Sequence, residues 1–268
     1  MKKIKNLDFS KNVRKNILKL SHKANSSHIG SSLSIVDLLV VIYNEIIKPK
    51  SKKDLENSLY KLILSKGHAC LALYCILYEM KILNKKTLLS FGNENSILMQ
   101  HVSHKVPGVI LSTGSLGHGL PVGTGLALSS KLKNKKKIII VLISDGELNE
   151  GTTWEALLFA AHHQLDNLVV IVDYNKLQSL TTVKKTLNVE PLEKKFQSFG
   201  CKTKFINGHN FNQIKKNILL KTSKKPLVII ANTIKGKGVS FMENKIAWHY
   251  KSPNLEELKK GLEEIKNA

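Results

Sequence analysis

The sequence has little arginine, little cysteine and no long apolar run. Only Arg14 among its 42 basic residues is an arginine, so the formal net charge of +22 comes from lysine. Arginine is the side chain that binds phosphate and guanine through paired hydrogen bonds, and its near absence argues against a nucleic-acid partner in spite of the charge. The lysines cluster in residues 131–137, 184–185, 194–195 and 224–225, between apolar segments. We interpret them as a solvated basic surface.

The cysteines and the apolar segments exclude two further classes of protein. Cys70, Cys75 and Cys201 form no C-x-x-C pair, and their odd number argues against a disulfide framework. No apolar run approaches the roughly 18 residues that span a bilayer, and the amino terminus lacks the apolar segment of a secretory signal. We therefore expect neither a secreted nor a membrane-spanning protein, and a reducing cytoplasm fits.

Apolar runs alternate with amphipathic segments along the chain, which is typical of a parallel sheet with helices on both faces. Strands are expected at residues 62–64, 138–143, 168–172, 203–206 and 227–232, and helices at 69–80, 122–132, 152–163, 192–199, 210–220 and 254–266. A chain of 268 residues is long enough for one large domain with a full core. We predict a single α/β domain over residues 1–268, with a doubly wound, mostly parallel sheet.

Two segments between these elements carry separate expectations. Ser34 followed by Asp37 resembles a capping box that starts a helix reaching Ile47, and Pro49 ends it. Residues 84–110 have few periodic apolar positions and are expected to form a long irregular loop, a kind of loop that is usually functional.

Polar side chains follow two neighbouring strands of the predicted sheet. Asp145 comes just after residues 138–143, and Asn175 follows residues 168–172, thirty positions later. The helix at residues 152–163 is long enough for a right-handed crossover, so both residues should reach the edge where open α/β sheets bind ligands. One carboxylate, one amide oxygen and a nearby carbonyl suit Mg²⁺ held jointly with a diphosphate. Taken singly, Asp145 is an ordinary turn residue and Asn175 an ordinary helix cap.

Further motifs accompany this pair in a fixed order. They are Asn25-Ser26-Ser27-His28-Ile29-Gly30, Leu64-Ser65-Lys66-Gly67-His68-Ala69, Ser112-Thr113-Gly114-Ser115-Leu116-Gly117-His118-Gly119 and Trp248-His249. The Asp-Gly with its distant Asn resembles the thiamine diphosphate fingerprint, and the motifs around it resemble transketolase. The likeness begins at about residue 10 and covers only the first third of a full-length transketolase. It is greatest with the N-terminal, diphosphate-binding subunit of the split, two-chain form.

The resemblance implies a role for individual residues. The metal ligands would be Asp145, Asn175 and the carbonyl of Leu177. Contacts with thiamine diphosphate would come from His68, Gly114, Leu116, Gly146, Glu147, Asn175 and His249. Catalytic roles on the substrate would fall to His28, His68, His101 and His249, because imidazole can donate and accept protons near neutral pH. Glu150 and Glu155 would belong to a proton-relay network between two active sites.

Each of these residues also has an ordinary structural interpretation. The glycines of residues 114–119 could form a packing turn, any one histidine could be a surface or capping residue, and Glu150 and Glu155 are typical first-turn helix residues. The chain also departs from the family pattern at Ser27, Ile29, His118, Ser144 and Tyr250. None of these changes removes a ligand atom, but they leave the substrate preference open, and Tyr250 could narrow the substrate channel.

The function that follows is that of a transketolase-type transferase subunit, which moves a two-carbon unit from a ketose to an aldose, as sugars or sugar phosphates. The resemblance places the acid that activates thiamine on a pyrimidine-binding half, so activity is expected only with a C-terminal partner subunit, in a two-plus-two heterotetramer. A related thiamine-dependent synthase of a deoxy-sugar or branched sugar is the alternative within the enzyme class. A silent scaffold or nucleic-acid-binding protein of the same fold is the alternative outside it.

Overall fold

The fold is built on a five-stranded parallel sheet in a computed structural model that describes residues 5–268. The strands are β1 (Tyr60–Leu64), β2 (Ile138–Ser144), β3 (Leu168–Tyr174), β4 (Lys202–Asn207) and β5 (Leu227–Asn232), in the order β1-β2-β3-β5-β4. All neighbouring strands pair in parallel. Each predicted strand is confirmed, and β1 and β3 extend two residues beyond the expected bounds.

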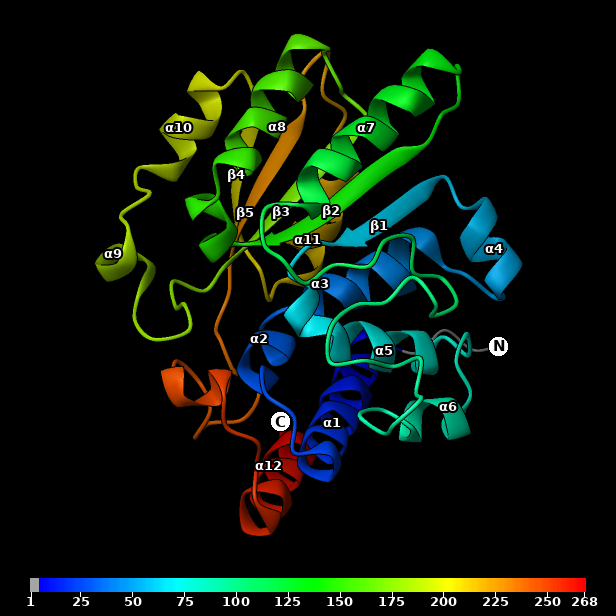
Figure 1. Cartoon of the computed structure of the whole chain (residues 1–268), viewed down its shortest axis with the longest axis vertical. Coiled ribbons are helices and arrows are strands. Elements are labelled where there is room, and N and C mark those ends of the chain that lie inside the picture. The colour runs from blue at the N-terminus through cyan, green and yellow to red at the C-terminus, as the bar shows by residue number, and fades with distance from the viewer. Residues whose placement is uncertain (1–4) are drawn as a thin grey trace.

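The strands are continuous apolar runs because both faces of the sheet are covered. In β2, Ile139, Val141 and Ile143 pack into the hydrophobic core on one face of the sheet, whereas Ile140 and Leu142 pack into the core on the other face. Helices cover both faces (Figure 1). The predicted doubly wound α/β class is therefore confirmed.

Six helices lie within a few residues of their predicted bounds, whereas no bounds were predicted for the helices Asn6–Ala24 and Ile29–Ser34. On one face lie α7 (Gly119–Leu132), α8 (Gly151–His162) and α10 (Leu192–Ser198). On the other lie α1 (Asn6–Ala24), α2 (Ile29–Ser34), α3 (Val36–Val40), α5 (Cys70–Glu79) and α11 (Phe211–Ile218), with α12 (Leu255–Asn267) packed on α1. The remaining short elements are η1 (Val41–Ile47), α4 (Lys52–Asn57), η2 (Gly67–Ala69), α6 (Lys85–Leu89), η3 (Asp145–Asn149), α9 (Val183–Thr186) and η4 (Ile246–His249). No helix among residues 5–268 is both long and apolar enough to cross a membrane.

The expected capping box at Ser34 and Asp37 is wrong. Ser34 is the last residue of α2, and its hydroxyl donates to Asp173 at 2.6 Å. Asp37 is buried and pairs with Arg14, whose guanidinium donates to both carboxylate oxygens at 3.0 and 2.7 Å. The helix expected to reach Ile47 is interrupted at Ile35 and ends as the π-helical turn η1. Ser34 and Asp37 thus bind residues that are distant in the sequence, and their side chains are not available to cap a helix.

The segment from residue 84 to 110 is irregular as predicted, except for the short helix α6. Its last part runs between Val102 and Thr113, which form an isolated antiparallel bridge. Residues 103–112 therefore leave this bridge and return to it as a loop. This loop begins next to His101 and ends next to Gly114.

Candidate active site

The carboxyl ends of β2 and β3 carry the predicted oxygen ligands into one pocket. Asp145 opens the turn η3 after β2, and Asn175 follows β3, with Ser144 and Asp173 paired in the sheet register. Both residues are buried, and both line a pocket of about 380 Å³ together with Leu177. The structure therefore brings these three residues together in one pocket, and their role as metal ligands stays a prediction.

Neighbouring groups fix the direction of both side chains. The Asp145 carboxylate accepts the Lys176 N–H at 2.6 Å. The Asn175 amide donates to Asp173 at 3.0 Å, and its oxygen accepts the Leu177 N–H at 3.1 Å. Because an ionised Asp173 can only accept, it sets which end of the amide is nitrogen. The Asn175 oxygen is thereby held on the side of Leu177.

None of the ion pairs among the described residues includes Asp145. The buried carboxylate of Asp145 therefore has no cationic side chain within ion-pair distance there. Burial and the charge of Asp173 raise the pKa of Asp145 to about 7, although the Lys176 N–H acts against the shift. A divalent cation at this carboxylate would remove that penalty. Among residues 5–268 no three His, Cys, Asp or Glu side chains gather at a metal-ligand spacing, which fits a site of mixed carboxylate, amide and carbonyl oxygens.

The four predicted histidines come together at the same pocket from four separate segments. The ring centroid of His28 lies 5.3 Å from that of His68, 5.9 Å from that of His101 and 4.9 Å from that of His249. His28 has a left-handed backbone conformation, φ 67°, and its N–H donates to the His249 carbonyl at 2.7 Å. All four rings line the pocket, so this part of the prediction is placed as expected.

The rings of His28, His68 and His249 are held neutral, because the pKa of each lies below its ordinary value. Burial, followed by the charges of His101, Lys235 and Lys66, lowers the pKa of His28 to about 4. Burial and Lys235 lower the pKa of His249 to about 3, and burial lowers that of His68 well below its ordinary value. Each neutral ring offers one donor and one acceptor, which suits recognition of hydroxyl and carbonyl groups.

Two buried lysines at this pocket were missed by the sequence analysis. Lys66, 1% exposed, forms an ion pair with the fully buried Asp173, which also accepts hydrogen bonds from Ser34 and Thr233. Lys235, also 1% exposed, reaches the His249 ring at 3.0 Å and the Gln178 carbonyl at 3.0 Å.

The interpretation of lysine as solvated surface holds for the clusters named above and is wrong for Lys66 and Lys235. The signal that could have found Lys66 was its place between an apolar strand and Gly67-His68.

The turn after β2 and the loop before α7 supply hydrogen-bond donors to the pocket wall. Gly114, Leu116 and Gly146 line the pocket as predicted. A Cβ at Gly146 would meet nothing nearer than 3.7 Å, so the backbone there is open to a ligand. Asn149, another lining residue, has a buried amide nitrogen without a hydrogen-bond partner. An unpaired buried donor of this kind fits an anionic ligand such as a diphosphate.

The three predicted glutamates have different positions. Glu147 does not line the pocket: its buried carboxylate accepts the N–H groups of Ser144 at 2.9 Å and Gly117 at 3.1 Å and a hydrogen bond from Ser65. With the Ser144 hydroxyl it forms a capping box that closes η3, which gives Ser144 a defined role. Glu150 lines the pocket and is exposed. Glu155 lies exposed on α8, away from the described pocket lining.

The fold and the pocket together define a class of protein, an α/β enzyme that holds a diphosphate cofactor at the carboxyl ends of its strands. The family model described as "Transketolase, thiamine diphosphate binding domain" matches residues 8–263. The chain belongs to this family, as a thiamine diphosphate-binding chain of transketolase type.

Comparison with individual proteins agrees with this assignment. An apulose-4-phosphate transketolase subunit of Actinobacillus succinogenes is 41% identical, over 96% of this chain and 95% of the relative. A protein of the same name from Phocaeicola vulgatus is 34% identical, over 94% of this chain and 90% of the relative. The crystal structure of transketolase from Campylobacter jejuni aligns with a TM-score of 0.90 and 29% identity, covering 97% of this chain and 42% of that one. The chain thus spans less than half the length of that transketolase.

Proposed function

We propose that this chain is the diphosphate- and metal-binding subunit of a split transketolase, which transfers a two-carbon ketol unit from a ketose phosphate to an aldose phosphate. The observation that carries the proposal is the single pocket in which Asp145, Asn175 and Leu177 lie beside four histidine rings. One end of this pocket has the chemistry for a metal-bound diphosphate, and the other has the chemistry for a polyhydroxylated substrate.

In this proposal the chain binds Mg²⁺ through the Asp145 carboxylate, the Asn175 oxygen and the Leu177 carbonyl. Asp173 keeps the Asn175 amide oriented through the 3.0 Å hydrogen bond to its nitrogen. The diphosphate would accept from the backbone at Gly146, from the free amide of Asn149 and from Lys235, whose ammonium is already buried at the pocket wall. The resemblance implied a direct contact between Glu147 and the cofactor. In this proposal Glu147 acts indirectly, because its side chain stabilises the turn η3 that carries Asp145 and Gly146.

The histidines act on the substrate. Thiamine diphosphate, when bound, supplies the electron sink that lets a carbon–carbon bond next to a ketose carbonyl break. His28, His68, His101 and His249 would then hydrogen-bond the hydroxyl and carbonyl oxygens of the sugar and carry protons to and from them. Because burial and nearby lysines lower the pKa of His28 and His249, these rings remain available as acceptors at neutral pH.

We propose that residues 1–268 form one domain and that the active unit is a two-plus-two heterotetramer with a pyrimidine-binding partner subunit. Support comes from the chain lengths, because this chain corresponds to almost all of two relatives that are themselves named as transketolase subunits and to less than half of a full-length transketolase. Glu150 and Glu155 would reach a second active site only in such an assembly. Three free, buried cysteines agree with a reducing cytoplasm as the compartment, and the near absence of arginine agrees with no nucleic-acid partner.

The test is a product analysis with the assembled enzyme. The chain is purified together with its partner and incubated with Mg²⁺, thiamine diphosphate, an aldose phosphate acceptor and a ketose phosphate labelled at its first two carbons. Apulose 4-phosphate is included as a donor because two relatives carry its name.

We expect both labelled carbons in a ketose two carbons longer than the acceptor. A deoxy-sugar or branched-sugar product without two-carbon transfer would favour the related synthase and contradict the proposed activity.

A further inference from the structure

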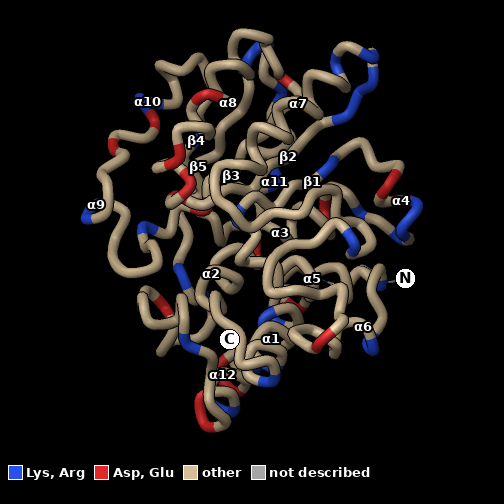
Figure 2. The backbone as a smooth tube through the Cα atoms, in the orientation of Figure 1, with Lys and Arg blue, Asp and Glu red and all other residues tan. Residues whose placement is uncertain are grey.

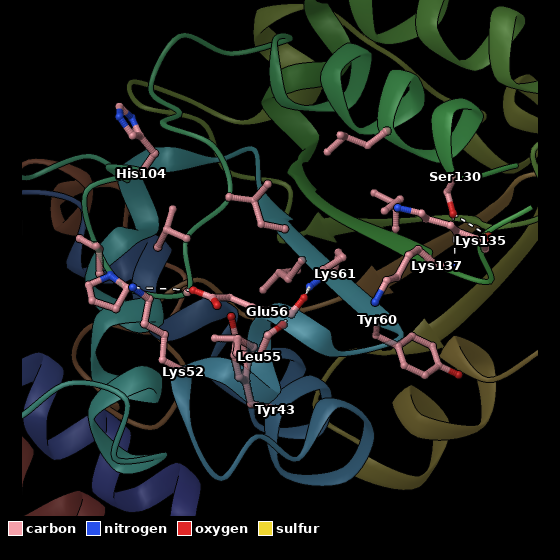
Figure 3. A pocket seen from close by; sticks show the side chains of 18 of the residues that line it. Tyr43, Lys52, Leu55, Glu56, Tyr60, Lys61, His104, Ser130, Lys135 and Lys137 are labelled. Atoms are coloured by element: carbon pink, nitrogen blue, oxygen red, sulfur yellow. Dashed lines mark hydrogen bonds and ion pairs between the residues drawn. The ribbon is translucent and has the colours of Figure 1, made fainter. Parts of the chain in front are cut away.

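A second and larger pocket lies at the β1 edge of the sheet, away from the histidine cluster. Its volume is about 600 Å³, and its walls come from α4, β1, residues 104–110, the end of α7 and the start of β2. It shares no lining residue with the cofactor pocket. Figure 3 shows the side chains that line the pocket, with Lys61 beside Glu56, and Lys135 and Lys137 on the side of Ser130.

Lysine is concentrated in this pocket beyond what the composition explains. Six of its 21 lining residues are lysines, about twice the share in the chain, where 42 basic residues less Arg14 leave 41 in 268. They are Lys52, Lys61, Lys105, Lys133, Lys135 and Lys137. The single acidic lining residue, Glu56, pairs with Lys52 at 3.7 Å. None of the other five has a carboxylate oxygen within ion-pair distance among the described residues. Figure 2 shows the basic stretch between α7 and β2 and, separately from it, the lysines at α4.

Two of these lysines are held in place by backbone carbonyls. Lys61 donates to the carbonyls of Leu55 and Glu56, and Lys137 donates to those of Asn57 at 2.9 Å and Ser58 at 2.7 Å. An ammonium group has three donors, so each lysine keeps one for another partner. Burial, and next the charge of Lys137, lowers the pKa of Lys61. The fold thus holds the positive charges of Lys61 and Lys137 near each other, which costs electrostatic free energy. A bound anion would offset this repulsion.

Much of the remaining lining is apolar, although Tyr43, Tyr60, His104, Ser129 and Ser130 also contribute. Leu62, Val106 and Ile139 are buried, and Leu126 is 36% exposed at the pocket wall. Gly108 has φ 88°, and a Cβ there would lie 2.3 Å from a methyl carbon of Leu55. The loop of residues 104–110 therefore packs closely against α4, and this contact fixes the distance between two walls of the pocket.

We propose that this pocket binds a nucleoside phosphate, with its phosphate groups among the lysines and its base against the carbon-rich walls. A volume of about 600 Å³ falls within the ordinary range of small-molecule sites, roughly 300–1,000 Å³. A sugar phosphate would satisfy the charge but would leave the apolar walls without a partner. The proposal does not depend on the reaction at the other pocket.

The loop that forms one wall also connects this pocket with the active site. Val102 pairs with Thr113 at the base of the loop, and the Thr113 hydroxyl donates to the Leu64 carbonyl at 2.6 Å. His101 and Gly114, the next residues outward, line the cofactor pocket. A ligand on residues 104–110 therefore contacts the loop whose two ends shape the active site.

Calorimetry and hydrogen exchange with the enzyme assembled from this chain and its partner subunit test the proposal. ADP and inorganic pyrophosphate are titrated separately, with thiamine diphosphate and Mg²⁺ at saturation so that the cofactor pocket is filled. We expect saturable ADP binding, at least tenfold tighter than pyrophosphate binding, and slower amide exchange at residues 104–110 when ADP is bound.

Charge reversal supplies the variants. Lys105→Glu with Lys135→Glu should weaken ADP binding at least tenfold, because both side chains line the pocket. Both lysines are exposed and form no side-chain hydrogen bond or ion pair that would hold the fold together among the described residues. Lys194→Glu, on the exposed surface of α10, is the matched control and should leave binding unchanged.

Several results would overturn the proposal. They are the absence of saturable ADP binding, equal weakening by Lys194→Glu, equal affinity for pyrophosphate, and exchange protection at the cofactor pocket in place of residues 104–110. Thermal melting of each variant and of the unaltered chain is followed by circular dichroism. Equal melting temperatures show that a change in binding does not come from unfolding.

Discussion

Asp173 is the residue on which most of the proposed metal site depends, although it is not itself a proposed ligand. It binds Lys66, Ser34, Thr233 and the amide of Asn175 at once. Burial alone would raise the pKa of Asp173, but the charge of Lys66 and these hydrogen bonds outweigh burial and lower it. Asp173 therefore stays ionised, and its fixed charge orients Asn175 while raising the pKa of Asp145.

The first residue-scale prediction concerns Asp145. Asp145→Ala removes the only carboxylate among the proposed metal ligands, so the affinity of the assembled enzyme for thiamine diphosphate with Mg²⁺ should fall at least tenfold, or about 1.4 kcal/mol. Calorimetric titration measures it. Asp166→Ala, an exposed aspartate before β3, is the control and should bind normally. Equal affinities in the two variants would remove Asp145 from the metal site.

The second prediction concerns His101, which lines the pocket and is exposed. His101→Ala should lower turnover by roughly 10²- to 10⁴-fold, the range for a positioned acid or base, with little change in melting temperature. His162→Ala, at the end of α8 remote from the pocket, should leave turnover unchanged. A large loss of stability with normal turnover per folded molecule would instead show a structural role.

The third prediction follows from the lowered pKa values of His28, about 4, and His249, about 3. Between these values and the ordinary pKa of about 6.5, the unfolded chain binds protons that the folded chain does not. The stability linked to these rings is thus complete above pH 6.5 and is lost as pH falls toward 4 and 3. Urea unfolding of the chain at several pH values should show this decline, and His28→Gln with His249→Gln should reduce its slope. Parallel slopes would contradict the shifted values.

Residue types explain what could be predicted at this scale. Asp145 and Asn175 follow predicted strands and His68 follows Gly67, so their positions are visible in the sequence. Lys66 and Lys235 resemble the other lysines until the partner of each is known. Lys66 pairs with Asp173, 107 positions away, and no local sequence pattern predicts that contact.

At the scale of elements, the buried ion pair between Arg14 on α1 and Asp37 on α3 fastens two helices together. Burial would raise the pKa of Asp37, but Arg14 and a hydrogen bond with His209 outweigh it and hold the pKa at about 2. His209 accepts the Ile234 N–H at 2.9 Å through its other nitrogen, so the cluster also reaches the segment after β5.

Breaking this pair should be costly. Arg14→Met leaves a buried carboxylate without its main partner, and the free energy of unfolding should fall by about 3–5 kcal/mol. Lys52→Met breaks the exposed pair with Glu56 and should cost at most about 0.5 kcal/mol. Urea denaturation measures both, and Arg14→Met with Asp37→Leu should recover part of the loss. A cost below about 1 kcal/mol for Arg14→Met would mean that the pair does not hold the helices.

The predicted elements succeeded where periodicity and burial agree. Strands covered on both faces are continuous apolar runs, so all five were visible, and six of the helices, α5, α7, α8, α10, α11 and α12, were found to within a few residues. The capping box at Ser34 failed because Ser34 and Asp37 bind residues far along the chain instead of the first turn of a helix. Local sequence patterns therefore predict where helices and strands lie. They do not predict which distant residues the polar side chains at the ends of these elements bind.

At the scale of the whole molecule, the chain has a fold that covers less than half of a full-length transketolase and nearly all of the two apulose-4-phosphate transketolase relatives. It contributes the diphosphate side of the proposed cofactor site and the histidines. Family membership could be predicted from the motif order, whereas the donor and acceptor sugars could not. Sugar-phosphate recognition commonly uses arginine, and the one arginine is engaged with Asp37.

The measurement that tests this account most directly is turnover by the chain alone and in a one-to-one mixture with its partner subunit. Both samples contain Mg²⁺ and saturating thiamine diphosphate, and two-carbon transfer from a ketose phosphate to an aldose phosphate is followed. We predict no detectable turnover by the chain alone and full turnover on mixing, since the proposed partner subunit would supply half of the cofactor's surroundings. Appreciable turnover by the chain alone would contradict the assignment of half an active site to this chain.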